Sequence, residues 1–380
     1  ISEKYIEEYF KDTAALNVKK ADVHPKVSEH IPEIMKFVKD LVDKSFAYEA
    51  DGDVYFSTRK FPEYGKLSGQ NIDDLESGAR IAIGEVKKDP LDFALWKARK
   101  EEGEIAWESP WGMGRPGWHI ECSAMAKKHL GATIDIHAGG QDLQFPHHEN
   151  EIAQSECCNG APFARYWMHN AYITMNRQKM SKSKGNFFTV RDIRKTYTGE
   201  EIRFFLLSGH YRSPIDFGED LMKQARASLE RLHNCKENLL YLTESGKAGD
   251  MTASEKEVRD GYETYRNRFI DVMDDDLNTA DGISVVFELV TAINSAVRAD
   301  TTAEFAKKSL ETLMEFADVL GILQIEEDNS VDEEIRKLVD ERQQARKDKN
   351  FARADEIRDM LRERGITLKD TPQGVQIVKE

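Results

Sequence analysis

Residues 133–156 read TIDIHAGGQDLQFPHHENEIAQSE, and this stretch decides the fold. We interpret Thr133–His137 as a strand and Pro146–Glu156 as a helix, with Gly139 and Gly140 following the strand. Other short apolar segments alternate with helical ones in the same part of the chain. This alternation is typical of an α/β domain.

The residues between the predicted strand and helix suit a nucleotide and a metal ion. Glycine allows a ligand to approach the backbone closely, and α/β sheets bind nucleotides at the carboxyl ends of their strands. Asp142 lies at that end and could accept a hydrogen bond from a ribose hydroxyl. His147 and Glu151 are four residues apart, share one helix face and can reach one metal ion. A surface hydrogen bond is the commoner role for such a pair, so both interpretations stay open here.

Length and composition limit the class of protein. The chain has 380 residues, which predicts two or three domains, each with its own core. Hydrophobic residues make up 40% and charged residues 32%, which excludes collagenous, low-complexity and globally disordered classes. The sequence contains no membrane-length apolar run, no signal peptide and no disulfide-framework spacing among its four cysteines. We therefore expect a cytoplasmic protein with no membrane partner.

The charge is unevenly distributed along the chain. A net charge of −15 argues against a uniformly basic surface for nucleic acid. Residues 177–195 differ, because seven basic side chains and one acidic side chain give this segment a charge of +6. It contains the string KMSKS at residues 179–183, with Lys179 and Lys182 separated by a methionine and a serine. Such a cationic, hydroxyl-rich loop suits phosphates whose charge shifts during a reaction.

Beyond residue 217 the pattern becomes helical. Apolar residues recur at spacings of three and four along one face of a long helix, namely Leu221, Ala225, Leu229, Leu232, Cys235, Leu239 and Leu242. Cys235 is therefore a core residue. Further helices at Ile283–Val297 and Phe305–Leu323 predict an all-α bundle, and a polar stretch after residue 325 opens a small C-terminal helical unit. The first 50 residues are also mostly helical. Residues 51–56 predict a hairpin or a helix-to-strand junction, and residues 109–117 predict a loop.

Several strings resemble those of cysteinyl-tRNA synthetases, a family of class I aminoacyl-tRNA synthetases. They include GRPGWHIECS (residues 114–123), FPHHENEIAQ (residues 145–154) and the KMSKS string. The likeness extends over essentially the whole chain. It implies a Rossmann-like nucleotide-binding catalytic domain, followed by the helical bundle and the small C-terminal unit.

The resemblance implies a zinc site. In the family, one zinc ion per chain is held by two cysteines, one histidine and one glutamate, and Cys122, His147 and Glu151 match three of these ligands. The zinc binds the thiolate of the substrate cysteine, which a serine hydroxyl replaces poorly, so no editing domain is required. Trp118 and His137 match residues that line the amino-acid pocket.

The resemblance also implies an ATP site and a domain plan. Gly139 and Asp142 match the adenosine side, while Lys179 and Lys182 match the catalytic lysines beside the phosphates of ATP, which enters with Mg²⁺. Residues 1–186 then form the remaining catalytic domain, with an insertion at about residues 20–110. The other predicted parts are a stem-contact region at 187–218, a tRNA-binding bundle at 219–325 and an anticodon-contact unit at 331–380.

One departure from the family pattern concerns the beginning of the chain. The His-x-Gly-His or His-x-Gly-Asn signature is absent, and so is the cysteine that precedes it as the fourth zinc ligand. Cys157 and Cys158 are poor substitutes, since six helical residues beyond Glu151 advance the chain by about 9 Å. We expect from this that the sequence lacks the family's N-terminal segment and that its catalytic domain is incomplete.

Three functions are compatible with these observations. The leading one is ligation of cysteine to tRNA(Cys) through a cysteinyl-adenylate, by a monomer that binds cysteine, ATP and tRNA. A ligase of the mycothiol pathway, which attaches cysteine to an amino-sugar, is the nearer alternative, but the long helical C-terminus favours the tRNA enzyme. A non-catalytic tRNA-binding fragment is the other. Residues 331–380 hold as many acidic as basic side chains, so their anticodon contact follows from the resemblance alone.

Overall fold

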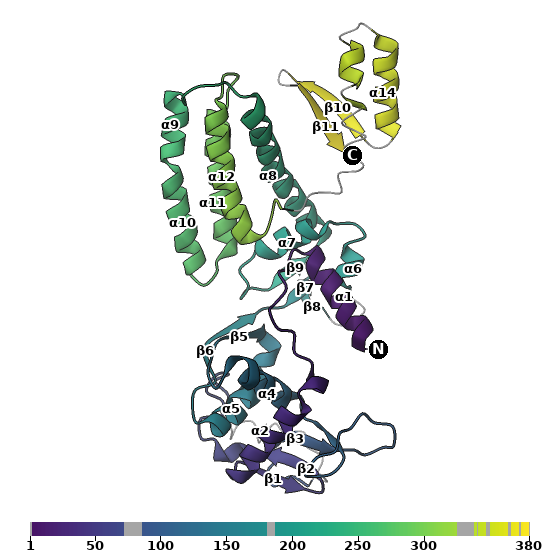
Figure 1. Cartoon of the computed structure of the whole chain (residues 1–380), viewed down its shortest axis with the longest axis vertical. Coiled ribbons are helices and arrows are strands. Elements are labelled where there is room, and N and C mark those ends of the chain that lie inside the picture. The colour runs from purple at the N-terminus through teal and green to yellow at the C-terminus, as the bar shows by residue number, and fades with distance from the viewer. Residues whose placement is uncertain are drawn as a thin grey trace. The chain divides into compact units, whose positions relative to one another are not determined.

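A computed structural model describes residues 2–71, 86–180, 187–324, 338–339, 341–346, 350–363, 366–371 and 374–379 (Figure 1). The chain divides into two compact units, Ile1–Phe316 and Ala317–Glu380. Within the described ranges, no helix combines the length and the apolar character that crossing a membrane requires.

A four-stranded antiparallel sheet forms the first part of the larger unit. Its strands lie in chain order and are β1 (Ala47–Ala50), β2 (Asp53–Phe56), β3 (Phe93–Ala98) and β4 (Gly114–Pro116). The predicted hairpin is confirmed, with Asp51 and Gly52 at positive φ between β1 and β2. The helix α2 (Ile31–Asp43) contributes its apolar face to a core that also contains Phe56 and Trp96. Single helical turns lie at Val27–Glu29 and Thr58–Lys60.

Part of the stretch at residues 133–156 lies in a parallel pair of strands. These strands are β5 (Ile134–Gly140) and β6 (Ala164–Asn170), flanked by the helices α4 (Trp118–Leu130) and α5 (Glu149–Asn159). The predicted strand is confirmed but continues to Gly140, so both glycines lie inside it. The helix begins at Glu149, three residues after the predicted Pro146, and Phe145 in the preceding turn has extended backbone angles (φ −137°, ψ 133°). Short turns at Gln141–Leu143 and Gln144–His148 connect β5 to α5.

A small three-stranded sheet follows, with the strand order β8-β7-β9. Its elements and the helices near it are β7 (Ile173–Met175), β8 (Gln178–Lys179), β9 (Ile215–Phe217), α1 (Ser2–Ala15), α6 (Val190–Ile193) and α7 (Gly199–Leu207). The end of α1 lies against the start of α7, where a Cβ on Gly199 would come within 1.8 Å of the Ala15 carbonyl oxygen. Arg203 donates from Nη1 to the carbonyl oxygens of Leu16 and Asn17, at 3.0 and 3.1 Å. Glycine at position 199 thus permits the close packing that ties the N-terminal helix to α7.

Long helices make up the rest of the larger unit (Figure 1). They are α8 (Glu219–Ser245), α9 (Ala253–Asp260), α10 (Tyr262–Asp274), α11 (Thr279–Ala296) and α12 (Ala303–Leu320). The predicted apolar face of α8 is confirmed from Ala225 to Leu239, and Cys235 is a core residue. The prediction that Leu221 belongs to this face is wrong, since its side chain is 42% exposed while Met222 is fully buried. The helices α9 and α10 were not predicted, because charged residues obscure their apolar spacing.

The smaller unit differs from the helical unit that the sequence predicts. Beyond α12 it contains the helix α14 (Phe351–Glu363) and an antiparallel hairpin of β10 (Ile366–Thr371) and β11 (Gly374–Lys379). The Asn350 side chain accepts a hydrogen bond from the Arg353 backbone N–H at 3.3 Å, which caps the start of α14. A small apolar cluster holds Ile357, Leu361 and Ile366.

Replacing Leu232 with alanine tests the packing of α8. The Leu232 side chain is fully buried, so Leu232→Ala removes apolar contacts and leaves a cavity. We expect the free energy of unfolding to fall by about 2–5 kcal/mol in denaturant titration. The matched control is Leu221→Ala on the same helix, for which a change within about 0.5 kcal/mol is expected. Equal losses from both variants would contradict the observed burial.

Candidate functional site

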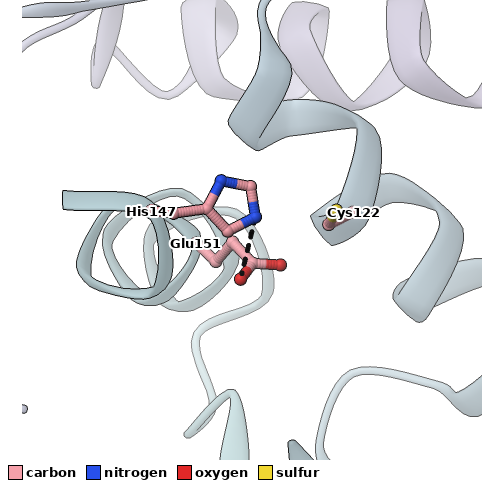
Figure 2. Close-up of side chains that lie close together, drawn as sticks. All are labelled: Cys122, His147 and Glu151. Carbon is pink, nitrogen blue, oxygen red and sulfur yellow. Dashed lines mark ion pairs between the residues drawn. The ribbon is translucent and has the colours of Figure 1, made fainter. Parts of the chain in front are cut away.

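Three side chains of the predicted metal set meet between α4 and α5. Cys122 comes from the second turn of α4, His147 from the turn before α5, and Glu151 from the first turn of α5 (Figure 2). Their ligand atoms all lie within 4.8 Å of one another, and His147 Nε2 is 3.6 Å from Glu151 Oε2. The fold therefore brings Cys122 beside two residues that lie 25 or more positions further along the chain.

The Glu151 carboxylate shows that this place fits a cation. Its side chain is fully buried, and among the described residues Oε1 has no hydrogen-bond partner. A buried carboxylate oxygen without a partner is costly unless a positive charge or a metal ion approaches it. A thiol, an imidazole and a carboxylate are also the donor set that zinc prefers. The residues present thus suit a zinc ion.

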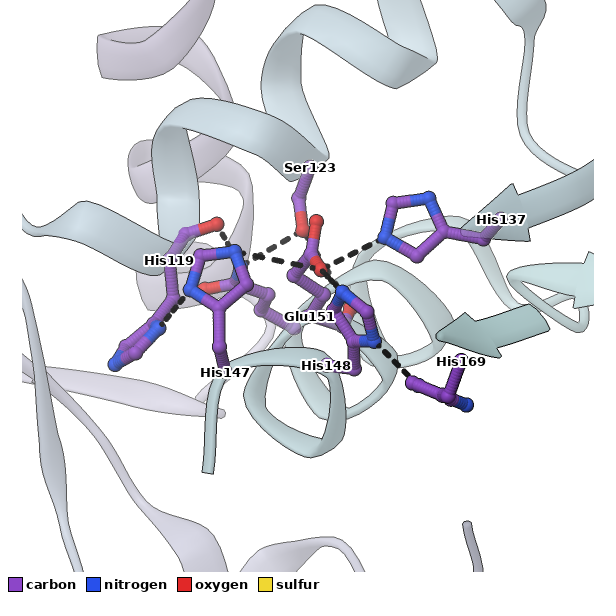
Figure 3. A network of polar contacts seen from close by, with 8 residues as sticks. His119, Ser123, His137, His147, His148, Glu151 and His169 are labelled. Carbon is purple, nitrogen blue, oxygen red and sulfur yellow. Dashed lines mark hydrogen bonds and ion pairs between the residues drawn. The ribbon is translucent and has the colours of Figure 1, made fainter. Parts of the chain in front are cut away.

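A second group of possible ligands shares the same carboxylate. His137, His148 and Glu151 also offer ligand atoms within 4.8 Å of one another (Figure 3). His137 Nε2 lies 2.9 Å from Glu151 Oε2, and His148 Nε2 lies 3.9 Å from it. Sequence reasoning missed His148, although its spacing of three residues from Glu151 is a usable signal. The sequence predicts that His137 lines the amino-acid pocket, and the structure places its ring beside Glu151.

Two further histidines, His119 and His169, pair with His147 and His148. His119 Nδ1 is 2.8 Å from His147 Nδ1, and His148 Nδ1 is 2.8 Å from His169 Nε2 (Figure 3). In each pair one ring nitrogen must carry the proton and the other must accept it. The pairing leaves His147 Nε2 turned toward Glu151. Outer partners of this kind fix the orientation of a metal ligand.

Burial controls the protonation of the cluster. It lowers the pKa of His119 to about 4 and that of His148 to about 3, with nearby histidines adding to the effect. It also lowers the pKa of His147, although Glu151 opposes the shift. Burial, together with the charges of Glu151 and Glu121, raises the pKa of the Cys122 thiol to about 12. His119, His147 and His148 are therefore neutral near pH 7, as metal ligands must be, and a thiolate at Cys122 requires a nearby cation.

The residues predicted for the amino acid and nucleotide lie close by. Trp118 is exposed, and its ring centroid lies 4.4 Å from that of His147. Gly139 packs against the histidine cluster, since a Cβ at this position would lie 2.8 Å from His148 Cε1. It leaves room for the histidine cluster. Asp142 Oδ2 is 3.8 Å from Lys179 Nζ, which lies 3.7 Å from the centroid of the Tyr172 ring.

Lys182 lies outside the described residues, as do the other residues of 181–186. The part of the KMSKS string that the structure describes ends at Met180, directly after β8. Of the two lysines predicted for the ATP phosphates, Lys179 is therefore the one whose position the structure describes.

Glu149 anchors the start of α5 and was missed by sequence reasoning. Its carboxylate accepts hydrogen bonds from the backbone N–H groups of Gly65 and Ser68, both at 2.9 Å, and from Ser68 Oγ at 2.9 Å. The neighbouring Asn150 accepts from the Tyr64 hydroxyl at 2.5 Å. These bonds hold the loop at residues 64–68 against the helix that carries Glu151.

Three family models match consecutive parts of the chain. Residues 1–227 match the class I (C) tRNA synthetase catalytic domain, residues 268–324 match the DALR domain, and residues 328–377 match the cysteinyl-tRNA ligase anticodon binding domain. The cysteine–tRNA ligase of Clostridioides difficile (strain 630) is 54% identical over 376 residues, which cover 99% of this chain and 81% of that relative.

Solved structures show the same fold at low identity. Mycobacterium tuberculosis methionyl-tRNA synthetase in complex with methionyl-adenylate gives a TM-score of 0.56 at 12% identity, over 83% of this chain and 75% of that one. A putative arginyl-tRNA synthetase from Campylobacter jejuni gives 0.55 at 10% identity, over 82% and 65%.

The fold and the matched catalytic domain define a class I aminoacyl-tRNA synthetase, which confirms the predicted fold class. The chain belongs to the cysteinyl-tRNA synthetase family. It is an aminoacyl-tRNA ligase with the function of a cysteine–tRNA ligase, and ATP and tRNA are its partners. These matches do not favour the mycothiol ligase or the non-catalytic fragment.

Replacing His119 tests its role as the outer partner of His147. His119→Ala removes the ring that orients His147, so we expect zinc affinity to fall by about 10–100-fold in competition with a chromogenic chelator. His129→Ala is the matched control, because His129 lies on the same helix but contacts His30. Unchanged zinc affinity in His119→Ala would show that His147 needs no such support.

Proposed function

We propose that Cys122, His147 and Glu151 hold one zinc ion per chain and that this site selects cysteine for ligation to tRNA(Cys). The observation that carries the proposal is the buried Glu151 carboxylate, whose Oε1 lacks a partner among the described residues beside a thiol and an imidazole. When bound, zinc would take the sulfur of the substrate in preference to a hydroxyl oxygen, which distinguishes cysteine from serine.

The other residues of the cluster have distinct tasks in this proposal. His137 holds Glu151 Oε2 at 2.9 Å, which leaves Oε1 for the metal. His119 sets the ring of His147. Trp118, whose ring stacks on His119 and lies 4.4 Å from that of His147, forms one wall of the amino-acid pocket. The neutral rings of His119 and His148 add no positive charge that would compete with the metal for a thiolate.

The nucleotide side of the site carries the chemistry of activation. The carboxylate of cysteine attacks the α-phosphorus of ATP, pyrophosphate leaves, and cysteinyl-adenylate forms. A hydroxyl at the 3′ end of tRNA then attacks the carbonyl carbon and releases AMP. In this scheme Asp142 accepts from a ribose hydroxyl beside Gly139. Lys179 and Lys182 neutralise the phosphates of ATP, which binds with Mg²⁺.

The remaining parts of the chain would hold the tRNA. We assign stem contact to residues 187–218, tRNA binding to the bundle at 219–325 and anticodon contact to residues 331–380. The matched anticodon binding domain supports the last assignment. We further propose a cytoplasmic monomer.

Replacing Cys122 tests the metal set. Cys122→Ser exchanges a soft thiolate for a hydroxyl, so we expect zinc to be lost on dialysis against a mild chelator, as measured by inductively coupled plasma mass spectrometry. Cys157→Ser is the control, since Cys157 lies outside the ligand group. If Cys122→Ser kept its zinc while His148→Ala lost it, the metal would belong to the group of His137, His148 and Glu151 instead.

Replacing Lys182 tests the ATP site. Lys182→Ala removes a charge that balances the phosphates, so we expect adenylate formation to slow by about a hundredfold with little change in the KM for cysteine. The measurement is cysteine-dependent ATP–pyrophosphate exchange. Lys195→Ala is the matched control, because Lys195 is exposed and pairs with Asp192 at 2.8 Å. An equal rise in the KM for cysteine would contradict this role.

A further inference from the structure

A strained turn joins the helices α10 and α11. Asp276 and Leu277 both have left-handed backbone angles, with φ of 58° and 55°. Aspartate tolerates this region, but leucine rarely adopts it, and the Leu277 side chain is 48% exposed, so packing does not account for its conformation. Strain of this kind persists only where surrounding contacts hold it, and it is often found where a residue must be aimed at a particular place.

The turn aims the Asp276 carboxylate at the segment before β9. Oδ1 accepts a hydrogen bond from the Tyr211 hydroxyl at 2.7 Å, and Oδ2 pairs with Arg212 Nε at 2.9 Å. The Arg212 backbone N–H donates to His210 Nδ1 at 3.2 Å, so the proton of a neutral His210 ring lies on Nε2, 3.7 Å from Asp276 Oδ2. Three consecutive side chains from one segment thus converge on one carboxylate of the bundle.

The same segment holds the hairpin that carries Lys179. The Tyr211 carbonyl oxygen accepts from the Ala171 backbone N–H at 2.8 Å. Further along, β9 pairs in parallel with β7, and Asp216 Oδ1 accepts from the Arg177 backbone N–H at 2.8 Å and from Thr174 Oγ1 at 2.7 Å.

These bonds fix both ends of the strand β7 and the turn that leads into β8. The Tyr172 ring, beside which Lys179 lies, belongs to the same stretch, because the Tyr172 carbonyl oxygen accepts from the Ile215 backbone N–H at 3.2 Å. The position of Lys179 is therefore set by the segment that Asp276 binds.

We propose that Asp276 is a positioning residue for amino-acid activation, because it fixes the Tyr211 segment on which the Lys179 hairpin is built. The inference rests on the proposed role of Lys179 and Lys182 at the ATP phosphates. Its consequence is that the helical bundle contributes to a reaction that involves no tRNA. A turn that served only to dock tRNA would leave that reaction unchanged.

The test is cysteine-dependent ATP–pyrophosphate exchange on the full chain without tRNA. We expect Asp276→Ala to lower kcat by about fivefold or more and to raise the KM for ATP, with the KM for cysteine unchanged. Tyr211→Phe, which removes one oxygen atom and preserves the ring, should give a smaller loss of the same kind. The double variant should be no slower than Asp276→Ala, because both substitutions break one connection.

Asp275→Asn is the matched control. Asp275 is the exposed neighbour in the same turn, and it makes no ion pair with the described part of the chain, so its exchange rate should equal that of the unsubstituted protein. The proposal is overturned if Asp276→Ala and Tyr211→Phe exchange normally and only tRNA charging falls. It is also overturned if their effects add, or if Asp275→Asn causes the same loss. Normal exchange by Lys182→Ala would instead refute the proposed role of the lysines, so the two failures are distinguishable.

Discussion

The buried carboxylate of Glu151 is the constraint on which the site depends. A charge without solvent is tolerated only where its surroundings compensate for it. Here one oxygen is held by His137, and the other has no partner among the described residues. Around this group, Gly139 leaves room for His148, His119 pairs with His147, and Glu149 fixes the start of the helix that carries Glu151. The site is thus organised around one unfavourable burial that a bound cation would offset.

The sequence predicted much of this arrangement, for reasons that can be traced to particular residues. The spacing of His147 and Glu151 on one helix is a local property, and so is the apolar face of α8. The strand at residues 134–140 was predicted from its composition, but its end was misplaced, because the pairing of Gly139 with His169 involves a segment 30 residues away. Contacts of that range cannot be read from local pattern.

The histidine pairs show the same limit more clearly. His119 and His169 have an ordinary sequence context, the spacing of His148 from Glu151 is a signal that was not used, and only the fold brings the three beside His147 and His137. The lysine-rich string was recognised as a motif, yet its support by β9 and Asp216 depends on a parallel strand pair that no local signal predicts. The hairpin of the small C-terminal unit was missed as well, because the charged helix before it dominates the pattern.

The anchoring of α5 by Glu149 affects how the sequence can vary. Its carboxylate binds main-chain N–H groups of residues 65–68, which every amino acid except proline supplies. Other side chains at these positions can therefore change without removing the backbone bonds, although the Ser68 hydroxyl also donates to Glu149. Gly65 is restricted for a different reason, since φ is 96° there and a Cβ would lie 2.0 Å from the Gln70 carbonyl oxygen. One glycine and one glutamate, far apart in the chain, therefore depend on each other.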